Sequence, residues 1–406
     1  MSSSSCTGPS ESTPLSRALR PFAEFLKWKT ASGLLLMAFA VTAILWANSS
    51  WGAAYERLFA TKFTIGYGDS VLSKPLVLWI NDGLMAVFFF VVGLEIKREL
   101  LTGELNSARK AALPAAAALG GMIIPALLYL IFNQGLPSQS GWGVPMATDI
   151  AFSLGVLAML GKRVPLALKV LLTAVAIVDD LGAVVVIAVF YTASIKGGLL
   201  AASLLLIALA WVFGRAGGRH PVVFGVLGMA AWVFMLKSGV HATISGVLLA
   251  FALPSRQLAH EHAPLGQRWE HALHPWVAFL ILPGFALANA GVVVSGSFSQ
   301  ALTQPPSLGI ITGLVLGKPL GIFGFSWLAV KMGLASLPDG VTWGKVFGMS
   351  LLAGIGFTMS LFIADLAFGH APDLTYAKAG ILAGSLLSGM LGYLYLRFTT
   401  GRNYGL

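Results

Sequence analysis

Two adjacent carboxylates, Asp179 and Asp180, stand in the middle of a long apolar run. The run LALKVLLTAVAIVDDLGAVVVIAVFYT, from Leu166 to Thr192, is long enough as a helix to cross a bilayer core of roughly 30 Å. The pair then lies near the midplane, where one ionised carboxylate costs at least about 2.5 kcal/mol and a second adds repulsion. Such a pair survives where cations and protons visit it, so the run predicts an ion site. The alternative is a neutralised structural pair that holds helices together.

Two other apolar segments resemble interrupted helices at the same depth. One reads PMATDI over 145–150, and the other reads GIGFTMS over 354–360. Broken backbone at membrane depth is tolerated only inside protein or against water. If the two breaks cross, two half-helix ends of each sign meet at the midplane. Asp149 would then offset the N-terminal ends and Lys318, in the run LGKPLG, the C-terminal ends.

The two carboxylates of the pair cannot share one environment. On a helix of 3.6 residues per turn, Asp179 and Asp180 point about 100° apart. One of them can therefore pair with Lys318 while the other faces a cavity.

Charged residues also gather near the ends of other apolar segments. Asp82, in the run NDG near an outer end, is either a secondary site group or a surface charge. Six residues cluster at the inner ends of two segments: Glu95, Arg98, Glu99, Glu270, His271 and His274. They form either a solvated rim, where each ion pair is worth little, or a titrating gate, since histidine changes charge near neutral pH. His241 lies near the outer surface and is expected to pack.

The composition is typical of a multi-pass membrane protein. Of the 406 residues, 57% are hydrophobic and only 10% are charged, which excludes an ordinary soluble globule. The one cysteine, Cys6, excludes an intrachain disulfide framework. Twelve apolar segments are predicted, over 32–46, 77–94, 111–132, 144–160, 166–192, 198–213, 222–236, 240–253, 276–294, 308–330, 346–368 and 379–396. The sixth, seventh and eighth segments are short for a full crossing.

The distribution of basic residues predicts the topology. We expect residues 1–16 to form a disordered tail and residues 17–406 to form one transmembrane domain. If every segment crosses once, Lys and Arg favour one side of the membrane by about three to one. This bias places both termini in the cytoplasm. It also explains the net charge of +10 without a nucleic-acid partner.

The segment order indicates an internal repeat and a small hairpin. Segments three to five (111–192) and ten to twelve (308–396) each carry one interrupted helix and begin on opposite sides of the membrane, so they read as inverted copies. The outer loop 49–76 contains FTIGYGD, which alternates and turns like a β-hairpin. Its open edge would pair with a second copy of the chain, or the loop is a plain ordered connection.

Long stretches in the right order resemble the NhaA family of bacterial sodium/proton antiporters. They are 79–100 (WINDGLMAVFFFVVGLEIKREL), 147–157 (ATDIAFSLGVL), 163–168 (RVPLAL), 176–182 (AIVDDLG), 238–246 (SGVHATISG), 274–291 (HPWVAFLILPGFALANAG), 317–321 (GKPLG) and 354–363 (GIGFTMSLFI). The resemblance covers nearly all of the chain after about Arg17. It implies an all-α inner-membrane protein of about twelve spans with inverted repeats and two unwound, crossed helices.

The resemblance also implies roles for individual residues. Asp180 would bind the transported Na⁺ with Asp179 as its partner, and Lys318 would pair with Asp179. The remaining implied roles are the unwound site for Thr148 and Asp149, a cavity aspartate for Asp82, and pH sensing for Glu95, Arg98, Glu99, His241, Glu270 and His271. Gln267 stands where the family pattern has lysine, which puts the set-point of pH regulation in doubt.

The functional hypothesis is electrogenic exchange of cytoplasmic Na⁺ or Li⁺ for external H⁺, by competition at the buried Asp pair. Such a transporter is not an enzyme, needs no cofactor, and has the lipid bilayer and a second copy of itself as partners. A sodium-coupled symporter of an organic solute is the alternative, but it would need more aromatic or cationic groups near the midplane than Lys318 alone. A cation channel would show a repeated filter motif or a ring of charge.

Overall fold

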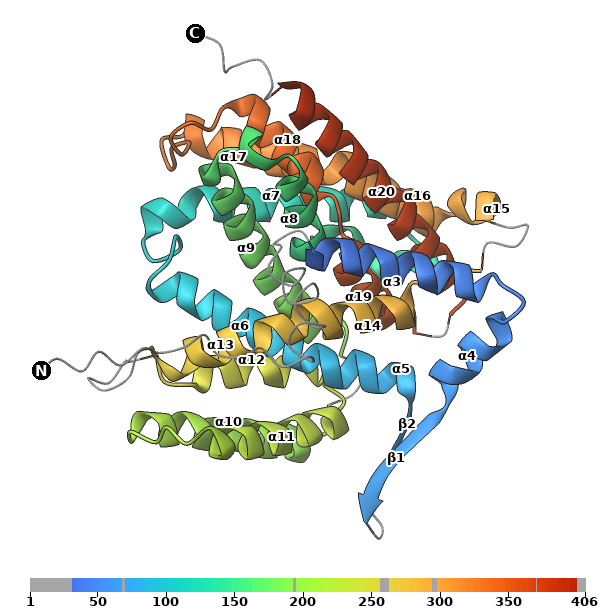
Figure 1. Cartoon of the computed structure of the whole chain (residues 1–406), viewed down its shortest axis with the longest axis vertical. Helices are drawn as coiled ribbons and strands as arrows, with labels where there is room; N and C mark the ends of the chain where they lie inside the picture. The colour runs from blue at the N-terminus through green and yellow to red at the C-terminus, as the bar shows by residue number, and fades with distance from the viewer. Residues whose placement is uncertain are drawn as a thin grey trace, which may run out of the picture.

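The computed structural model describes residues 31–67, 70–192, 195–255, 263–293, 298–369 and 371–399. These residues form a bundle of helices from which one β-hairpin projects (Figure 1). The predicted tail, 1–16, and the hairpin turn at 68–69 lie outside the described residues. The fold is therefore the predicted all-α polytopic one.

Every one of the twelve predicted segments coincides with helical structure. The matching elements are α3 (Ala31–Ala47), α5–η1–α6 (Leu76–Leu101), α7 (Ala108–Asn133), η2–α8 (Pro137–Met146 and Ile150–Met159), α9 (Leu166–Phe190), α10 (Gly197–Arg215), α11 (Pro221–Ser238), α12 (Thr243–Ala252), α13–η4–α14 (Leu265–Asn289), α16–η5–α17 (Pro305–Lys331), α18–α19 (Trp343–Ala353 and Phe357–Phe368) and α20 (Asp373–Thr399). Within the described residues, eight helices are long and apolar enough to span a membrane, or up to eleven if each bent pair is one span. The chain is therefore a multi-pass membrane protein.

Some predicted boundaries were wrong. Helices α10 and α11 have 19 and 18 residues, so of the three segments expected to be short only α12, with 10, is clearly so. The ninth segment begins at Leu265 and not near residue 276, because the first part of α13, LGQRWEHALHPW, carries a charged face that lowers its hydropathy. The first outer loop also contains an unpredicted helix, α4 (Gly52–Ala60), and a short helix, α15 (Phe298–Leu302), follows α14.

The two interrupted helices are broken where the sequence predicted, and the breaks touch. The axes bend by 43° between η2 and α8 and by 46° between α18 and α19. The Asp149 N–H donates to the Ile355 carbonyl at 2.7 Å, and Thr148 Oγ1 donates to the Ala353 carbonyl at 2.9 Å. These bonds satisfy backbone groups that the breaks expose, as the membrane interior requires. The first half of the first broken span, η2, is a 3₁₀-helix. The inverted repeat itself stays a prediction.

Glycines let α17 press against α7 and so position Lys318. Gly317 and Gly321 flank this lysine in a G-x-x-x-G spacing, which allows close backbone approach in membranes. A Cβ atom added at Gly321 would collide with the Gly120 carbonyl of α7, and one at Gly120 would collide with the Gly321 carbonyl. A π-helical turn, η5 (Gly313–Gly317), ends directly before Lys318. The crossing therefore fixes where the lysine enters the interior.

Gly321→Ala is expected to destabilise the protein by about 1–3 kcal/mol, because the methyl group forces α7 and α17 apart. Gly324→Ala on the same helix is the matched control, since a Cβ there meets nothing within 4 Å. Alanine is the better helix former, so the control should be neutral or slightly stabilising. Thermal unfolding of both purified variants would measure the difference, and equal midpoints would contradict the close approach.

The outer loop forms the predicted hairpin. Strand β1 (Lys62–Tyr67) pairs antiparallel with β2 (Ser70–Pro75), with Phe63 opposite Lys74. Phe63 and Ile65 on β1 are 54% and 53% exposed. The hairpin projects from the body beyond α4 (Figure 1). Its pairing with a second copy stays a prediction.

Candidate ion-binding site

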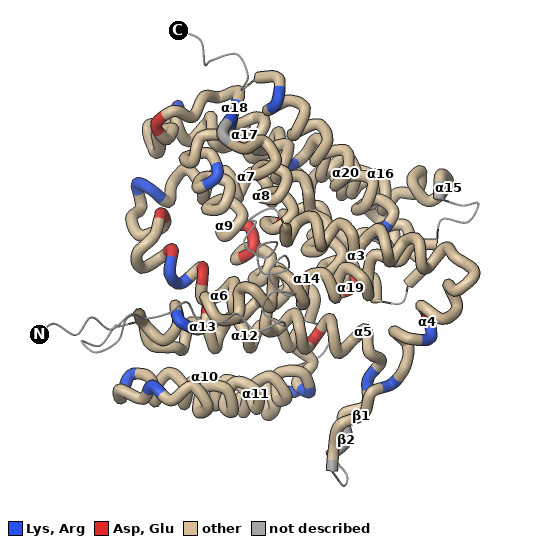
Figure 2. The backbone as a smooth tube through the Cα atoms, in the orientation of Figure 1, with Lys and Arg blue, Asp and Glu red and all other residues tan. Residues whose placement is uncertain are grey.

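Lys318 and Asp179 form a buried ion pair at the centre of the bundle. The Lys318 Nζ lies 2.7 Å from Asp179 Oδ2, and both side chains are 1% exposed. The ammonium also donates to Thr148 Oγ1 at 2.8 Å. Figure 2 shows acidic positions of α9 (red) inside the molecule, while most Lys and Arg positions (blue) lie nearer its edges. The sequence left open which aspartate pairs with Lys318, although the family resemblance implied Asp179.

Asp180 is the carboxylate of the pair that faces no protein donor. It is 1% exposed, and both of its oxygens are buried without a hydrogen-bond partner among the described residues. Asp179 Oδ1 is also buried without one. Buried carboxylate oxygens are rarely left unsatisfied, and each exception needs an explanation. Three such oxygens on neighbouring residues are suited to bind a small cation or a proton.

Asp149 caps two helices at the crossing. Its Oδ1 accepts from the Phe152 N–H at 2.9 Å, at the first turn of α8. Its Oδ2 accepts from the Thr358 N–H at 3.1 Å and from Thr358 Oγ1, at the first turn of α19. One carboxylate therefore lies at two helix N-termini, where it offsets their partial positive charge. In this conformation both oxygens of Asp149 accept hydrogen bonds from the starts of α8 and α19.

Asp149→Ala is expected to destabilise the crossing by roughly 1–4 kcal/mol, since each lost cap costs about 0.5–2 kcal/mol. Transport should fall only partly, because the Asp179–Asp180 pair keeps its oxygens. Asp149→Asn is the matched control, since asparagine caps helices as well as aspartate does. Unfolding midpoints and transport rates would be measured for both variants. Complete loss of transport in a folded Asp149→Ala protein would contradict a positioning role.

The predicted outer residues lie apart from the ion pair. Asp82, in the π-helical turn η1 (Ile80–Leu84), forms an ion pair: its Oδ2 lies 2.7 Å from Lys74 Nζ on strand β2. Its role as a cavity aspartate stays a prediction. His241, in the turn before α12, has its Nε2 3.0 Å from the Tyr191 carbonyl. Burial lowers the pKa of His241, which favours the neutral ring and agrees with a packing role.

The inner charged cluster forms only in part. Arg98 Nη2 lies 3.2 Å from Glu99 Oε1 and 3.7 Å from Glu95 Oε1, and Arg98 Nε lies 3.2 Å from Glu270 Oε1. One guanidinium thus holds three carboxylates from α6 and α13. His271 and His274 are exposed, and within the described residues neither forms a hydrogen bond or ion pair with these groups. The cluster therefore consists of Arg98 and three acidic residues, Glu95, Glu99 and Glu270, so acidic groups outnumber basic ones.

Three contacts near these sites were not expected from the sequence. Thr358 closes the second cap on Asp149. Lys97 Nζ donates to the Phe251 carbonyl at 2.7 Å and also to Leu253, at the C-terminal end of α12. Asn81 Nδ2 donates to Asp365 Oδ2 at 2.9 Å. Each pairs residues more than 150 positions apart, so no local spacing reveals it.

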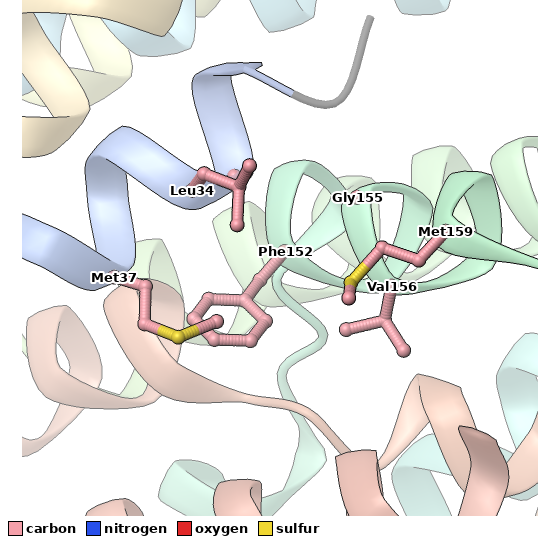
Figure 3. Close-up of a pocket in the computed structure, with 7 residues that line it drawn as sticks. Leu34, Met37, Phe152, Gly155, Val156 and Met159 are labelled. Atoms are coloured by element: carbon pink, nitrogen blue, oxygen red, sulfur yellow. The ribbon is translucent and has the colours of Figure 1, made fainter. Parts of the chain in front are cut away.

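Helix α3 covers the flank of α8, the half-helix that Asp149 caps. Apolar side chains from both helices line a small pocket between them (Figure 3): Leu34, Met37, Phe152, Val156 and Met159. Gly33 and Gly155 allow the close contact, because a Cβ added at Gly33 would lie 3.3 Å from the Gly155 Cα. The site helix is therefore shielded on this side by apolar packing.

Comparison with known proteins identifies the family. The family model described as Na⁺/H⁺ antiporter 1 matches residues 23–396. A Na(+)/H(+) antiporter NhaA of Rhodospirillum rubrum is 51% identical over 94% of this chain and 98% of the relative. Proteins of the same name from Oleidesulfovibrio alaskensis and Shewanella frigidimarina are each 49% identical, over 95% and 93% of this chain and 95% and 96% of the relatives. The chain therefore belongs to the NhaA family of Na⁺/H⁺ antiporters.

Proposed function

We propose that the protein exchanges cytoplasmic Na⁺ or Li⁺ for external H⁺ at the Asp179–Asp180 pair. The single observation that carries this proposal is the set of three buried carboxylate oxygens that have no hydrogen-bond donor among the described residues, beside two broken helices. The names of the relatives support sodium and protons as the transported ions. The protein is a transporter and not an enzyme, and it needs no cofactor.

Competition for one site couples the two flows. A proton on Asp180 neutralises the carboxylate, and so does Na⁺, whose coordination Asp179 Oδ1 and nearby backbone oxygens would complete. The empty site carries two carboxylates and only one ammonium, and an uncompensated buried charge is costly. The bundle therefore changes its access with an ion or a proton bound, rather than empty. Rocking of one group of helices about the site supplies alternating access.

The exchange is electrogenic if more than one proton returns for each sodium ion. Each net elementary charge then gains about 2.3 kcal/mol per 100 mV of membrane potential. This energy would drive sodium out of the cell even when the outside is alkaline.

The cluster of Arg98 with Glu95, Glu99 and Glu270 is the proposed regulatory region at the inner mouth. Its excess of negative charge attracts cations to the entrance. His241 and His271 are weaker candidates for pH sensing, because they contact neither the cluster nor the ion pair in the described residues. Gln267, in place of lysine on α13, leaves the set-point of regulation to be measured.

The proposed setting is the inner membrane of a bacterium, with both termini in the cytoplasm. We also propose a homodimer joined through the hairpin, because the Phe63 and Ile65 side chains are exposed beside an open strand edge. A sodium-coupled symporter is less well supported, since the only cation that the described residues place at the Asp pair, Lys318, is already bound to Asp179 and Thr148.

Proton flux in everted vesicles tests the function. The protein is expected to release protons from acid-loaded vesicles on addition of Na⁺ or Li⁺, and the initial rate should be followed over a pH series. K⁺ addition and vesicles without the protein are the controls. Acceleration by an imposed membrane potential would support electrogenic exchange, and no cation-driven flux at any pH would refute the function.

A further inference from the structure

A layer of polar side chains lies on the outer side of the ion pair, between two groups of helices. Asn81 comes from η1, Asn289 from the end of α14, and Asp365 from α19. Asn81 and Asn289 are only 2% and 1% exposed. We call the spans Leu76–Leu101 and Leu265–Asn289 the panel helices, and α8, α9, α17, α18 and α19 the site helices. The layer thus joins a site helix to two panel helices.

The two asparagines hold each other in a fixed orientation. Asn289 Nδ2 donates to Asn81 Oδ1 at 2.8 Å and to the Phe285 carbonyl at 3.0 Å. Asn81 Nδ2 donates back to Asn289 Oδ1 at 3.2 Å. This exchange aims the Asn81 amide group across the boundary, where it donates to Asp365 Oδ2 at 2.9 Å. The donor is therefore oriented before it meets the carboxylate.

An apolar layer lies next to the polar one, toward the centre of the molecule. Phe362, one turn before Asp365 on α19, has its ring centroid 5.4 Å from that of Phe89 and 6.2 Å from that of Phe285. All three rings are at most 1% exposed. Helix α19 begins at the Asp149 cap and runs outward to Phe368. Both layers therefore separate the ion pair from the outer surface in this conformation.

We propose that the Asn81–Asp365 hydrogen bond is an outer latch, which fastens the site helices to the panel helices in the state that is closed to the outside. The inference rests on the proposed alternating access. Opening outward must part the phenylalanine rings and break the Asn81–Asp365 hydrogen bond. In this conformation Asp365 also interacts electrostatically with Lys378 on α20. The latch sets how often the outward-open state is reached.

The first test compares apparent sodium affinities on the two sides. Asp365→Ala removes the acceptor, so outward-open molecules become more frequent. Because apparent affinity scales with the fraction of binding-competent molecules, the KM for external Na⁺ should fall and that for cytoplasmic Na⁺ should rise, by up to about tenfold. Right-side-out and everted vesicles measure the two values. Asp365→Asn keeps an acceptor oxygen, so both of its KM values should stay close to those of the native protein. The same is expected of Asp373→Ala, which removes a matched acid at the outer start of α20.

The second test does not depend on transport. In a Cys6→Ser background, Ala364→Cys places a thiol at a fully buried position beside the latch. A membrane-impermeant maleimide added to right-side-out vesicles should label it several-fold faster when Asp365→Ala or Asn81→Ser is also present. Faster labelling without cation-driven flux would support the latch while refuting the proposed function. Unchanged labelling in both folded variants, or KM values that move in the same direction on both sides, would overturn the latch.

Discussion

Asp180→Asn is expected to abolish cation-driven proton flux while the protein still inserts and folds. The amide keeps the size of the side chain but cannot carry the negative charge that Na⁺ needs, nor take up and release a proton near neutral pH. Asp180 makes no hydrogen bond to the protein in the described residues, so its replacement breaks no structural contact. Removing a buried charge from beside Asp179 should even raise the unfolding midpoint slightly. We expect flux to fall at least about a hundredfold, equal to about 2.7 kcal/mol of barrier.

Everted vesicles with matched amounts of inserted protein would measure this effect. Asp339→Asn is the matched control, because it makes the same change at an exposed position between α17 and α18 and should leave flux unchanged. Undiminished flux in Asp180→Asn would show that the ion site lies elsewhere.

The helices that carry the site were largely predictable, because the lipid bilayer permits few kinds of backbone structure and few buried charges. A charge, a proline or a glycine in the middle of a membrane-spanning run costs free energy, so such residues usually mark a functional site. For this reason Asp179, Asp180 and both helix breaks could be recognised in the sequence. The structure places the breaks against each other, as expected, and it places Asp149 across both helix starts.

Contacts between distant residues were not predictable. Helix phase shows that Asp179 and Asp180 point apart, but only the crossing of α7 and α17 decides which of them meets Lys318. Even the nearby pair of Asp82 and Lys74, eight residues apart, depends on how strand β2 meets η1, which hydropathy cannot reveal. The start of α13 was placed too late because polar residues lower its hydropathy, and one of them, Glu270, pairs with Arg98 on α6.

Lys318→Ala is expected to lower stability more than it lowers transport. The substitution leaves the Asp179 carboxylate buried without its cation, and breaking a buried ion pair in this way costs about 3–5 kcal/mol. Thr148 Oγ1 still donates to the Ala353 carbonyl, so the broken helices stay joined. Asp180 keeps a carboxyl group, which can still bind Na⁺ when ionised and still take up and release a proton. Thermal unfolding of the purified variant, together with flux at a temperature well below its midpoint, would separate the two effects.

The double variant Asp179→Asn with Lys318→Gln makes this test decisive. Both partners are then neutral and of similar size, and removing both charges together is often harmless where removing one is not. The double variant should therefore regain most of the stability that Lys318→Ala loses. Lys331→Ala, at the exposed inner end of α17, is the control and should change neither stability nor flux by much. If Lys318→Ala abolishes flux in a protein that is as stable as the native one, the lysine takes part in the exchange itself and does more than hold Asp179.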